Sequence, residues 1–152
     1  MFAVQFYDVV LWLHITAVVT AFGALFAYPV FLAANAQAPL AQRAGFHRLQ
    51  IAFSKRVTGP AIVVILLAGI YLATDGEQWD EPWVSISFVM LIVIAGLGAT
   101  LLRRSEERLV TTADAGDESA YAAALATART WTLVTLVLIV FTIFVMTVKP
   151  FG

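Results

Sequence analysis

The sequence predicts an all-α integral membrane protein, an antiparallel four-helix bundle, and three observations favour that fold class. Hydrophobic residues make up 61% of the 152 residues and charged residues only 12%, whereas about a quarter of a soluble domain is charged. Four apolar runs each reach the roughly 17–25 residues that cross a hydrocarbon core. The runs are continuous rather than alternating, which favours helices over a membrane barrel. They are residues 9–34, 51–74, 83–102 and 131–148, and they leave room for one domain only, residues 1–152.

The third observation is the distribution of positive charge. Eight of the nine Lys and Arg residues lie in or beside two of the connections, and the connection over residues 75–82 has acidic residues but no cation. Because short cytoplasmic loops carry the excess of Lys and Arg, we expect both basic connections inside and both termini outside. The eight cations are Arg43, Arg48, Lys55, Arg56, Arg103, Arg104, Arg108 and Arg129.

The first run carries His14, the only histidine inside an apolar run. Steps of three and four residues along the run place one histidine, three alanines and one tyrosine on a single helix face. Small residues let membrane helices approach closely, so this stripe is either a helix–helix seam or a groove for a flat ligand beside His14. The stripe consists of His14, Ala17, Ala21, Ala24 and Tyr28.

The end of the first run, Ala34-Asn35-Ala36, resembles a signal-peptide cleavage site. We expect the run to be retained, because it exceeds the 7–15 apolar residues of a signal core and no Lys or Arg precedes it.

Residues 41–56 follow with a helical apolar period formed by Phe46, Leu49, Phe53 and Val57. This pattern predicts an amphipathic helix along the cytoplasmic interface. His47 falls on the polar side of that pattern, and we interpret it as solvated or at headgroup level.

The second run is interrupted near its inner end by Thr58-Gly59-Pro60. A helix starting at Pro60 would be too short to cross the membrane, so we expect a continuous helix kinked at a proline that cannot donate to the Arg56 carbonyl. The kink would gather an inner polar patch of Lys55, Arg56, Thr58 and Pro60. Anchoring by positive charge together with a packing kink explains this patch without a ligand.

Two connections remain. Residues 75–82 hold four carboxylates, but their spacing matches no calcium-binding loop, and we interpret them as a solvated turn. Residues 103–130 predict a helical hairpin that prolongs the third and fourth runs into the cytoplasm.

The chain has no cysteine, which excludes disulfides and thiol chemistry. No nucleotide, metalloprotease or nucleic-acid motif is present, so we expect no nucleic-acid partner.

An ionisable residue inside a span is a functional candidate with a partner to be named. By the predicted topology, Met90, Met146, Thr142 and Tyr71 lie at the level of His14. Haem iron accepts His alone or His with Met, so His14 is a candidate metal ligand to haem iron, with Met90 or Met146 as a second axial ligand. A structural hydrogen bond and proton handling are the alternatives. Proton handling needs a second titratable group, and no span shows an intramembrane Asp or Glu.

Several short motifs resemble those of HemJ-type protoporphyrinogen oxidases, which are small four-span bacterial membrane proteins. The chain is also similar to an uncharacterised family of small integral membrane proteins related in pattern to HemJ and to CopD-like membrane domains. The resemblance covers nearly the whole chain. It rests on Leu11-Trp12-Leu13-His14-Ile15, Tyr28-Pro29, Arg56-Val57-Thr58-Gly59-Pro60-Ala61, Ala68-Gly69-Ile70-Tyr71-Leu72 and Val148-Lys149-Pro150-Phe151.

The resemblance implies a bacterial inner-membrane protein whose shared function lies at His14, Lys55, Arg56, Pro60 and Lys149. HemJ-type proteins have a His and a Lys after the tryptophan of the third span, whereas Trp83 is followed here by Val84-Ser85-Ile86-Ser87-Phe88. We therefore expect an accessory protein that binds haem b, a porphyrin or another hydrophobic ligand, rather than an enzyme. A HemJ-like oxidase, a small transporter and a subunit of a membrane complex remain alternatives, and a homodimer is expected to help enclose a macrocycle.

Overall fold

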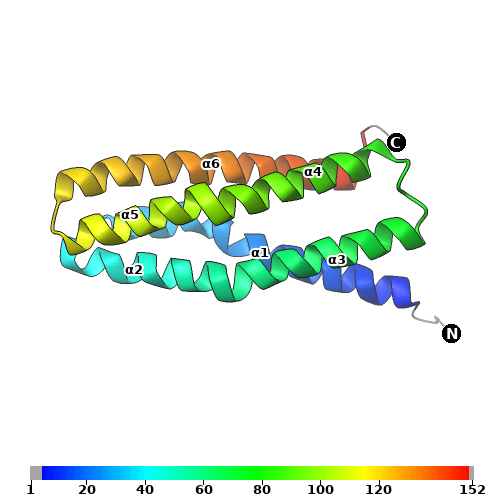
Figure 1. Cartoon of the computed structure of the whole chain (residues 1–152), viewed down its shortest axis with the longest axis horizontal. Coiled ribbons are helices and arrows are strands. Elements are labelled where there is room, and N and C mark those ends of the chain that lie inside the picture. Colours follow the sequence, from blue (N-terminus) through cyan, green and yellow to red (C-terminus); the bar gives the residue numbers. More distant parts are fainter. Residues whose placement is uncertain (1–4, 151–152) are drawn as a thin grey trace.

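The computed structural model describes residues 5–150, which fold into four long helices joined by three short connections (Figure 1). The first helix is α1, Phe6–Asn35. The second consists of α2, Leu40–Phe53, the π-helical turn η1, Ser54–Thr58, and α3, Gly59–Asp75. The third consists of α4, Pro82–Leu97, the π-helical turn η2, Gly98–Leu102, and α5, Arg103–Asp114. The fourth is α6, Glu118–Val148.

Each predicted apolar run lies inside one of these helices, and all four are long and apolar enough to cross a membrane. The prediction of four helical spans is therefore confirmed. The predicted extensions of the third and fourth runs are also present, as α5 and the first turns of α6. The predicted interfacial helix is not separate from the second span, because α2 continues through η1 into α3 as one helix of 36 residues.

The helices are longer than a bilayer requires. Their 30 to 36 residues correspond to about 45–54 Å at 1.5 Å per residue, against a hydrocarbon core of about 30 Å. The surplus lies at the end of the bundle where α1 meets α2 and α5 meets α6 (Figure 1). We call this end the His47 half and the end that carries both termini the His14 half.

A π-helical turn precedes Pro60 in the second helix. Within it the Gly59 N–H donates to the Ser54 carbonyl, five residues back, so the turn is one residue wider than an α-turn. A proline lacks the N–H that an α-helix would use at that position, and the wider turn accommodates the change within an unbroken helix. The predicted kink angle stays a prediction.

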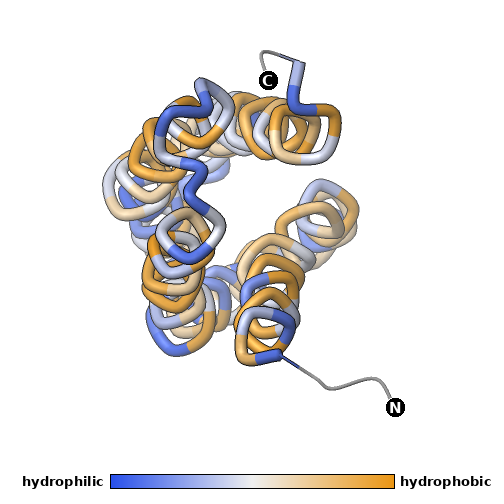
Figure 2. The backbone as a smooth tube through the Cα atoms, turned by 90° about the vertical axis from the view of Figure 1, so that its right-hand side faces the viewer, coloured by the Kyte–Doolittle hydropathy of each residue, from blue (hydrophilic) through white to orange (hydrophobic). Residues whose placement is uncertain are grey.

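Apolar clusters follow one another along the bundle. Figure 2, which views the bundle from one end, shows its helices arranged around a common axis. In the His47 half, Leu109, Tyr121 and Ala128 are almost fully buried. In the middle, Ala17 and Ala21 of α1 pack with Ile65 of α3 and Ile139 of α6. The His14 half has two smaller clusters, around Trp83 with Val145 and around Val10 with Leu72.

Large apolar side chains also cover much of the surface. Val30 is 69% exposed, Trp12 66% and Val19 65%, and in water contiguous exposure of this kind would drive aggregation. In a bilayer the same side chains contact acyl chains, so the surface suits lipid as its solvent.

Candidate functional site

The His14 half contains a cavity of about 310 Å³ between the pair α1 and α3 and the pair α4 and α6. We call it the His14 cavity. Its walls are mainly apolar, with a few polar side chains. The lining residues include His14, Phe22, Gly69, Trp83, Ser87, Ile94, Thr142, Met146 and Lys149.

His14 is buried in this cavity, with 7% of its surface exposed. The Ile65 carbonyl of α3 lies beside the ring, and Nδ1 has no hydrogen-bond partner among residues 5–150. Buried polar atoms without partners are rare and costly, and at a cavity wall such an atom marks a place where a ligand can bind.

Gly69 of α3 makes room for the imidazole. A Cβ built at Gly69 would lie 3.5 Å from His14 Cε1 and 3.7 Å from Phe88 Cζ. Those are ordinary van der Waals distances, so alanine fits at this position, whereas any larger side chain would project into the space beside the ring. The small residue thus sets the width of the cavity at His14.

The structure brings together some of the predicted partners of His14. Met146 and Thr142 of α6 line the same cavity. Met90 and Tyr71 do not line it. Met90 is half-buried on α4, and the Tyr71 ring packs edge-on against Phe6, with centroids 5.3 Å apart. Of the two predicted axial pairs, only His14 with Met146 shares a cavity.

A cation stands at one side of this cavity. Lys149 ends α6 in the left-handed conformation, with φ 49°, and its ammonium lies 4.5 Å from the centre of the Trp83 ring. Ser87, one turn further along α4, is buried and donates to the Trp83 carbonyl. His14 and Lys149 are thus two titratable side chains on one cavity wall.

The stripe that begins at His14 is a seam for part of its length. Ala17 and Ala21 are buried against α3 and Ile139, so the helices pack closely there, although Ala21 and Ala24 also border a second cavity. At the two ends of the stripe the helices separate: His14 lines the cavity just described, and Tyr28 enters a polar cluster in the His47 half.

That polar cluster is the feature that the sequence interpretation missed. His47 is 0% exposed, so its interpretation as a solvated residue is wrong. Its Nδ1 lies 2.8 Å from Glu106 Oε2 and its Nε2 lies 3.0 Å from the Tyr121 hydroxyl. Tyr28 donates its hydroxyl to Glu106 Oε1. One side chain from each of α1, α2, α5 and α6 therefore meets in a single buried network.

Charged groups surround the network at the end of the bundle. The Arg43 guanidinium lies 5.0 Å from the centre of the Tyr121 ring, and it pairs with Glu118 at 2.8 Å. Asn35 donates to the Arg43 carbonyl and approaches His47 Nε2 at 3.3 Å. With both Glu106 oxygens and both His47 nitrogens engaged, the network is well satisfied, which is the condition for a buried ion pair to be tolerated.

The sequence signal for this cluster was present, but the interpretation placed the apolar side of α2 at the membrane interface and His47 on the solvated polar side. Leu49 of that apolar side is 68% exposed. The buried face carries Ala44 and His47, three residues apart. On α5, Glu106 is buried on the same face as Leu109 and Ala113. A carboxylate and a histidine at core positions of two helices indicate an ion pair, provided that the two helices are known to face each other.

The predicted inner polar patch divides in two. Lys55 and Thr58 line a second cavity of the bundle, whereas Arg56 and Pro60 are exposed and line neither cavity.

Four apolar helices, a lipid-like surface and buried ionisable clusters define this chain as a multi-pass integral membrane protein. A family model described as "Predicted integral membrane protein (DUF2269)" matches residues 8–150, and the chain belongs to that family. No curated protein matches the chain, and no solved structure matches it. The relation to HemJ and to CopD-like domains stays a prediction.

Proposed function

We propose that this protein is a non-catalytic membrane protein that binds a hydrophobic small ligand in the His14 cavity, with His14 as the ligand's main polar contact. The observation that supports this most directly is the orphaned Nδ1 of His14 on the wall of a mainly apolar cavity of about 310 Å³. Ligand sites are concave, mostly apolar, carry a few polar groups and measure about 300–1,000 Å³. The cavity falls at the small end of that range.

Haem b or another porphyrin is the particular ligand to test first. His14 and Met146 line one cavity, and both residue types bind haem iron. A bound haem would supply redox or gas-binding chemistry. A porphyrin is larger than the cavity, however, so it would bind only if the helix pairs moved apart or if a second copy of the chain helped to enclose it. A homodimer is therefore part of the haem version of the proposal.

The membrane orientation is a proposal of the same kind. The positive-inside rule places the His47 half in the cytoplasm and the His14 cavity near the opposite face of a bacterial inner membrane. A cysteine introduced at Gln78, which lies in the connection between α3 and α4, should then react with an impermeant thiol reagent in intact spheroplasts. Labelling only after lysis would reverse the proposed orientation.

The absorption spectrum of protein purified from haem-replete cells tests the haem version. A Soret band that is lost in His14→Ala supports it. Met146→Leu should alter the band and Met90→Leu should not, because both changes conserve volume and only Met146 lines the cavity. A colourless wild-type protein would contradict the haem version.

The wider proposal is tested by mass spectrometry of small molecules that co-purify with the chain. Gly69→Leu places a side chain into the cavity beside His14, whereas Gly96→Leu adds the same side chain where no atom lies within 4 Å. A molecule retained by wild type and Gly96→Leu but lost in Gly69→Leu supports the proposal. Its equal retention in all three proteins would place the ligand elsewhere.

A HemJ-like oxidase is the second candidate, and one contact favours it. Lys149 lies against Trp83, so a cation stands beside the first turn of α4. HemJ-type proteins, which this chain resembles, carry a His and a Lys at that position. Growth of a strain without its own protoporphyrinogen oxidase would support this activity, and loss of growth in Lys149→Gln would connect it to this contact. A protein that co-purifies with the chain in a fixed ratio would instead favour a subunit of a membrane complex. Solute flux into proteoliposomes that contain the protein would favour a transporter.

A further inference from the structure

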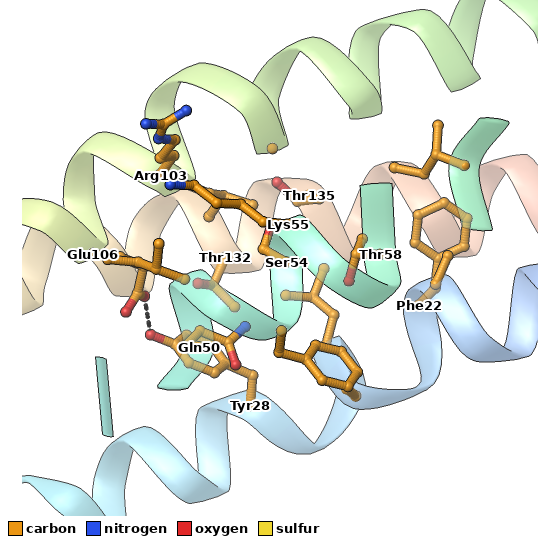
Figure 3. Close-up of a pocket in the computed structure, with 18 of the residues that line it drawn as sticks. Phe22, Tyr28, Gln50, Ser54, Lys55, Thr58, Arg103, Glu106, Thr132 and Thr135 are labelled. Carbon is orange, nitrogen blue, oxygen red and sulfur yellow. Dashed lines mark hydrogen bonds between the residues drawn. The ribbon is translucent and has the colours of Figure 1, made fainter. Parts of the chain in front are cut away.

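A second cavity, of about 90 Å³, lies in the middle of the bundle, next to the two π-helical turns (Figure 3). We call it the Lys55 cavity. It is separate from the His14 cavity, although Phe22 and Ile94 line both. Its polar side chains come mainly from α2, η1, α5 and α6, and its apolar side chains come from α1, α2, α3, α4 and η2. The polar ones include Gln50, Ser54, Lys55, Thr58, Arg103, Glu106, Thr132 and Thr135.

Thr132 provides an unpartnered polar group in this cavity. It is 2% exposed, and its hydroxyl has no hydrogen-bond partner among residues 5–150. The other threonines of α6 all donate to the carbonyl four residues back. They are Thr127, Thr130, Thr135, Thr142 and Thr147. Thr132 does not follow this hydrogen-bonding pattern, so its hydroxyl is available to a ligand.

Two cations stand at the edge of the cavity. Lys55 of η1 and Arg103, the first residue of α5, are the exposed charged residues of its wall, and in Figure 3 the Lys55 side chain extends toward Arg103. Arg103 pairs with Glu107 at 2.9 Å. Lys55 makes no salt bridge within the described part of the chain. Like charges held close together are unfavourable, and a bound anion would offset that cost.

Glu106 is the acidic residue of the wall, and both of its carboxylate oxygens already have partners. One accepts from Tyr28 and the other lies 2.8 Å from His47 Nδ1. Neither Lys55 nor Arg103 is paired with Glu106, so both cations remain available to a ligand. The opposite wall is apolar, with Phe22, Leu25 and Ile94, and the volume is on the order of a headgroup with one or two waters.

We propose that the Lys55 cavity binds the carboxylate or phosphate group of an acidic membrane amphiphile. The anionic group contacts Lys55 and the Thr132 hydroxyl, and the first carbons of the chain contact Phe22 and Ile94. A single-chain acid and an acidic phospholipid share this chemistry. The polar side chains of this site do not line the His14 cavity.

The test uses the delipidated full-length protein in a neutral detergent, with native mass spectrometry and thermal unfolding as readouts. The probes are oleate, phosphatidic acid, phosphatidylcholine and inorganic phosphate. The expected result is a bound mass and a raised melting temperature with oleate or phosphatidic acid, and neither effect with phosphatidylcholine. The two acidic probes distinguish a fatty acid from a phospholipid. If inorganic phosphate stabilises the protein as much as the acidic amphiphiles do, the proposal of an amphiphile is overturned in favour of a soluble anion.

Neighbouring residues give a matched pair of variants. Lys55→Gln removes a cation of the cavity wall, and Arg56→Gln removes the next cation along the chain, which does not line the cavity. Lys55→Gln should weaken binding about ten- to hundredfold, the cost of a lost charge-assisted hydrogen bond, and Arg56→Gln should not change it. Equal weakening by the two would mean that the acids bind to surface charge and would overturn the site.

Thr132→Val provides a second test that does not depend on charge. Valine replaces the hydroxyl by a methyl group of similar shape, so the ligand-free protein should melt at a higher temperature while its affinity for the acid falls. A threonine with only a structural role would not be expected to change the melting temperature and the affinity in opposite directions. Unchanged affinity in Thr132→Val would overturn its proposed contact with the ligand.

Discussion

The two halves of the bundle are made from the same four helices but are completed differently. In the His47 half, the buried side chains of His47 and Glu106 bond to each other and to the hydroxyls of Tyr28 and Tyr121. In the His14 half, a buried histidine has an orphaned nitrogen and faces a cavity of about 310 Å³. A satisfied polar network fixes the helices in one arrangement, whereas an unsatisfied one beside a cavity leaves room for a ligand.

The difference has a local cause in each half. In the His47 half, α2 packs against α5, and the 2.8 Å contact between His47 Nδ1 and Glu106 Oε2 joins these two helices directly. In the His14 half, the space opposite His14 is bordered by Gly69 and Ala73, which are too small to fill it.

The largest effect is expected from Glu106→Ala. This change leaves His47 and the Tyr28 hydroxyl buried without their partner, and breaking a buried pair in this way costs about 3–5 kcal/mol. The free energy of unfolding, measured by circular dichroism in mixed micelles, should fall by that amount. Glu107→Ala is the control, because its pair with Arg103 is exposed and such pairs contribute about 0–1 kcal/mol. Equal effects would mean that the His47 half does not depend on its network.

A smaller loss is expected from Tyr28→Phe. The change removes the hydroxyl that donates to Glu106 and leaves an acceptor of the buried carboxylate unpaired, at a cost of about 1–3 kcal/mol. Tyr7→Phe, in the first turn of α1, is the control because the Tyr7 hydroxyl makes no hydrogen bond to another described residue. Thermal unfolding of the two variants compares the halves directly, and a larger loss for Tyr7→Phe would reverse the contrast.

Gly69→Ala should stabilise the protein while narrowing the His14 cavity. Alanine in a helix interior gains about 0.5–1 kcal/mol over glycine, and at Gly69 its methyl group meets the His14 ring at an ordinary distance. Gly96→Ala should give a similar gain without touching the cavity. We expect retention of the co-purified ligand to fall only in Gly69→Ala. A destabilised Gly69→Ala would show that the cavity is narrower than the structure indicates.

The smallest effect is expected at the start of α6, where Asp117 caps the helix. Its carboxylate accepts from the Ala120 N–H and from the Ser119 hydroxyl, and these bonds lower the pKa of Asp117. A lowered folded-state pKa means that the stabilisation is complete above about pH 4 and is lost as pH falls through the folded pKa. Asp117→Ala should therefore melt below wild type at neutral pH, and the two melting temperatures should converge in acid. A difference that grows in acid would contradict this assignment.

The sequence predicted the parts of the candidate site that depend on one helix at a time. His14 stood out because it interrupts an apolar run, and Met146 because it lies at a similar level in another run. It could not separate Met146 from Met90, since that choice depends on how α4 and α6 are rotated about their axes. His47 was misplaced for the same reason: the sequence interpretation put it on the polar, solvated side of α2, whereas packing against α5 buries the face that carries Ala44 and His47.

By itself, the sequence determined that this is a four-span membrane protein, because length, hydropathy and the need to satisfy backbone groups in lipid act within each segment. It also determined where the spans lie and which connections carry positive charge. Only the tertiary structure decided that His47 meets Glu106, that the alanine stripe is a seam in its middle, and that His14 faces a cavity. Those outcomes depend on the rotation and spacing of neighbouring helices, which side-chain packing between distant segments sets and which no single segment encodes.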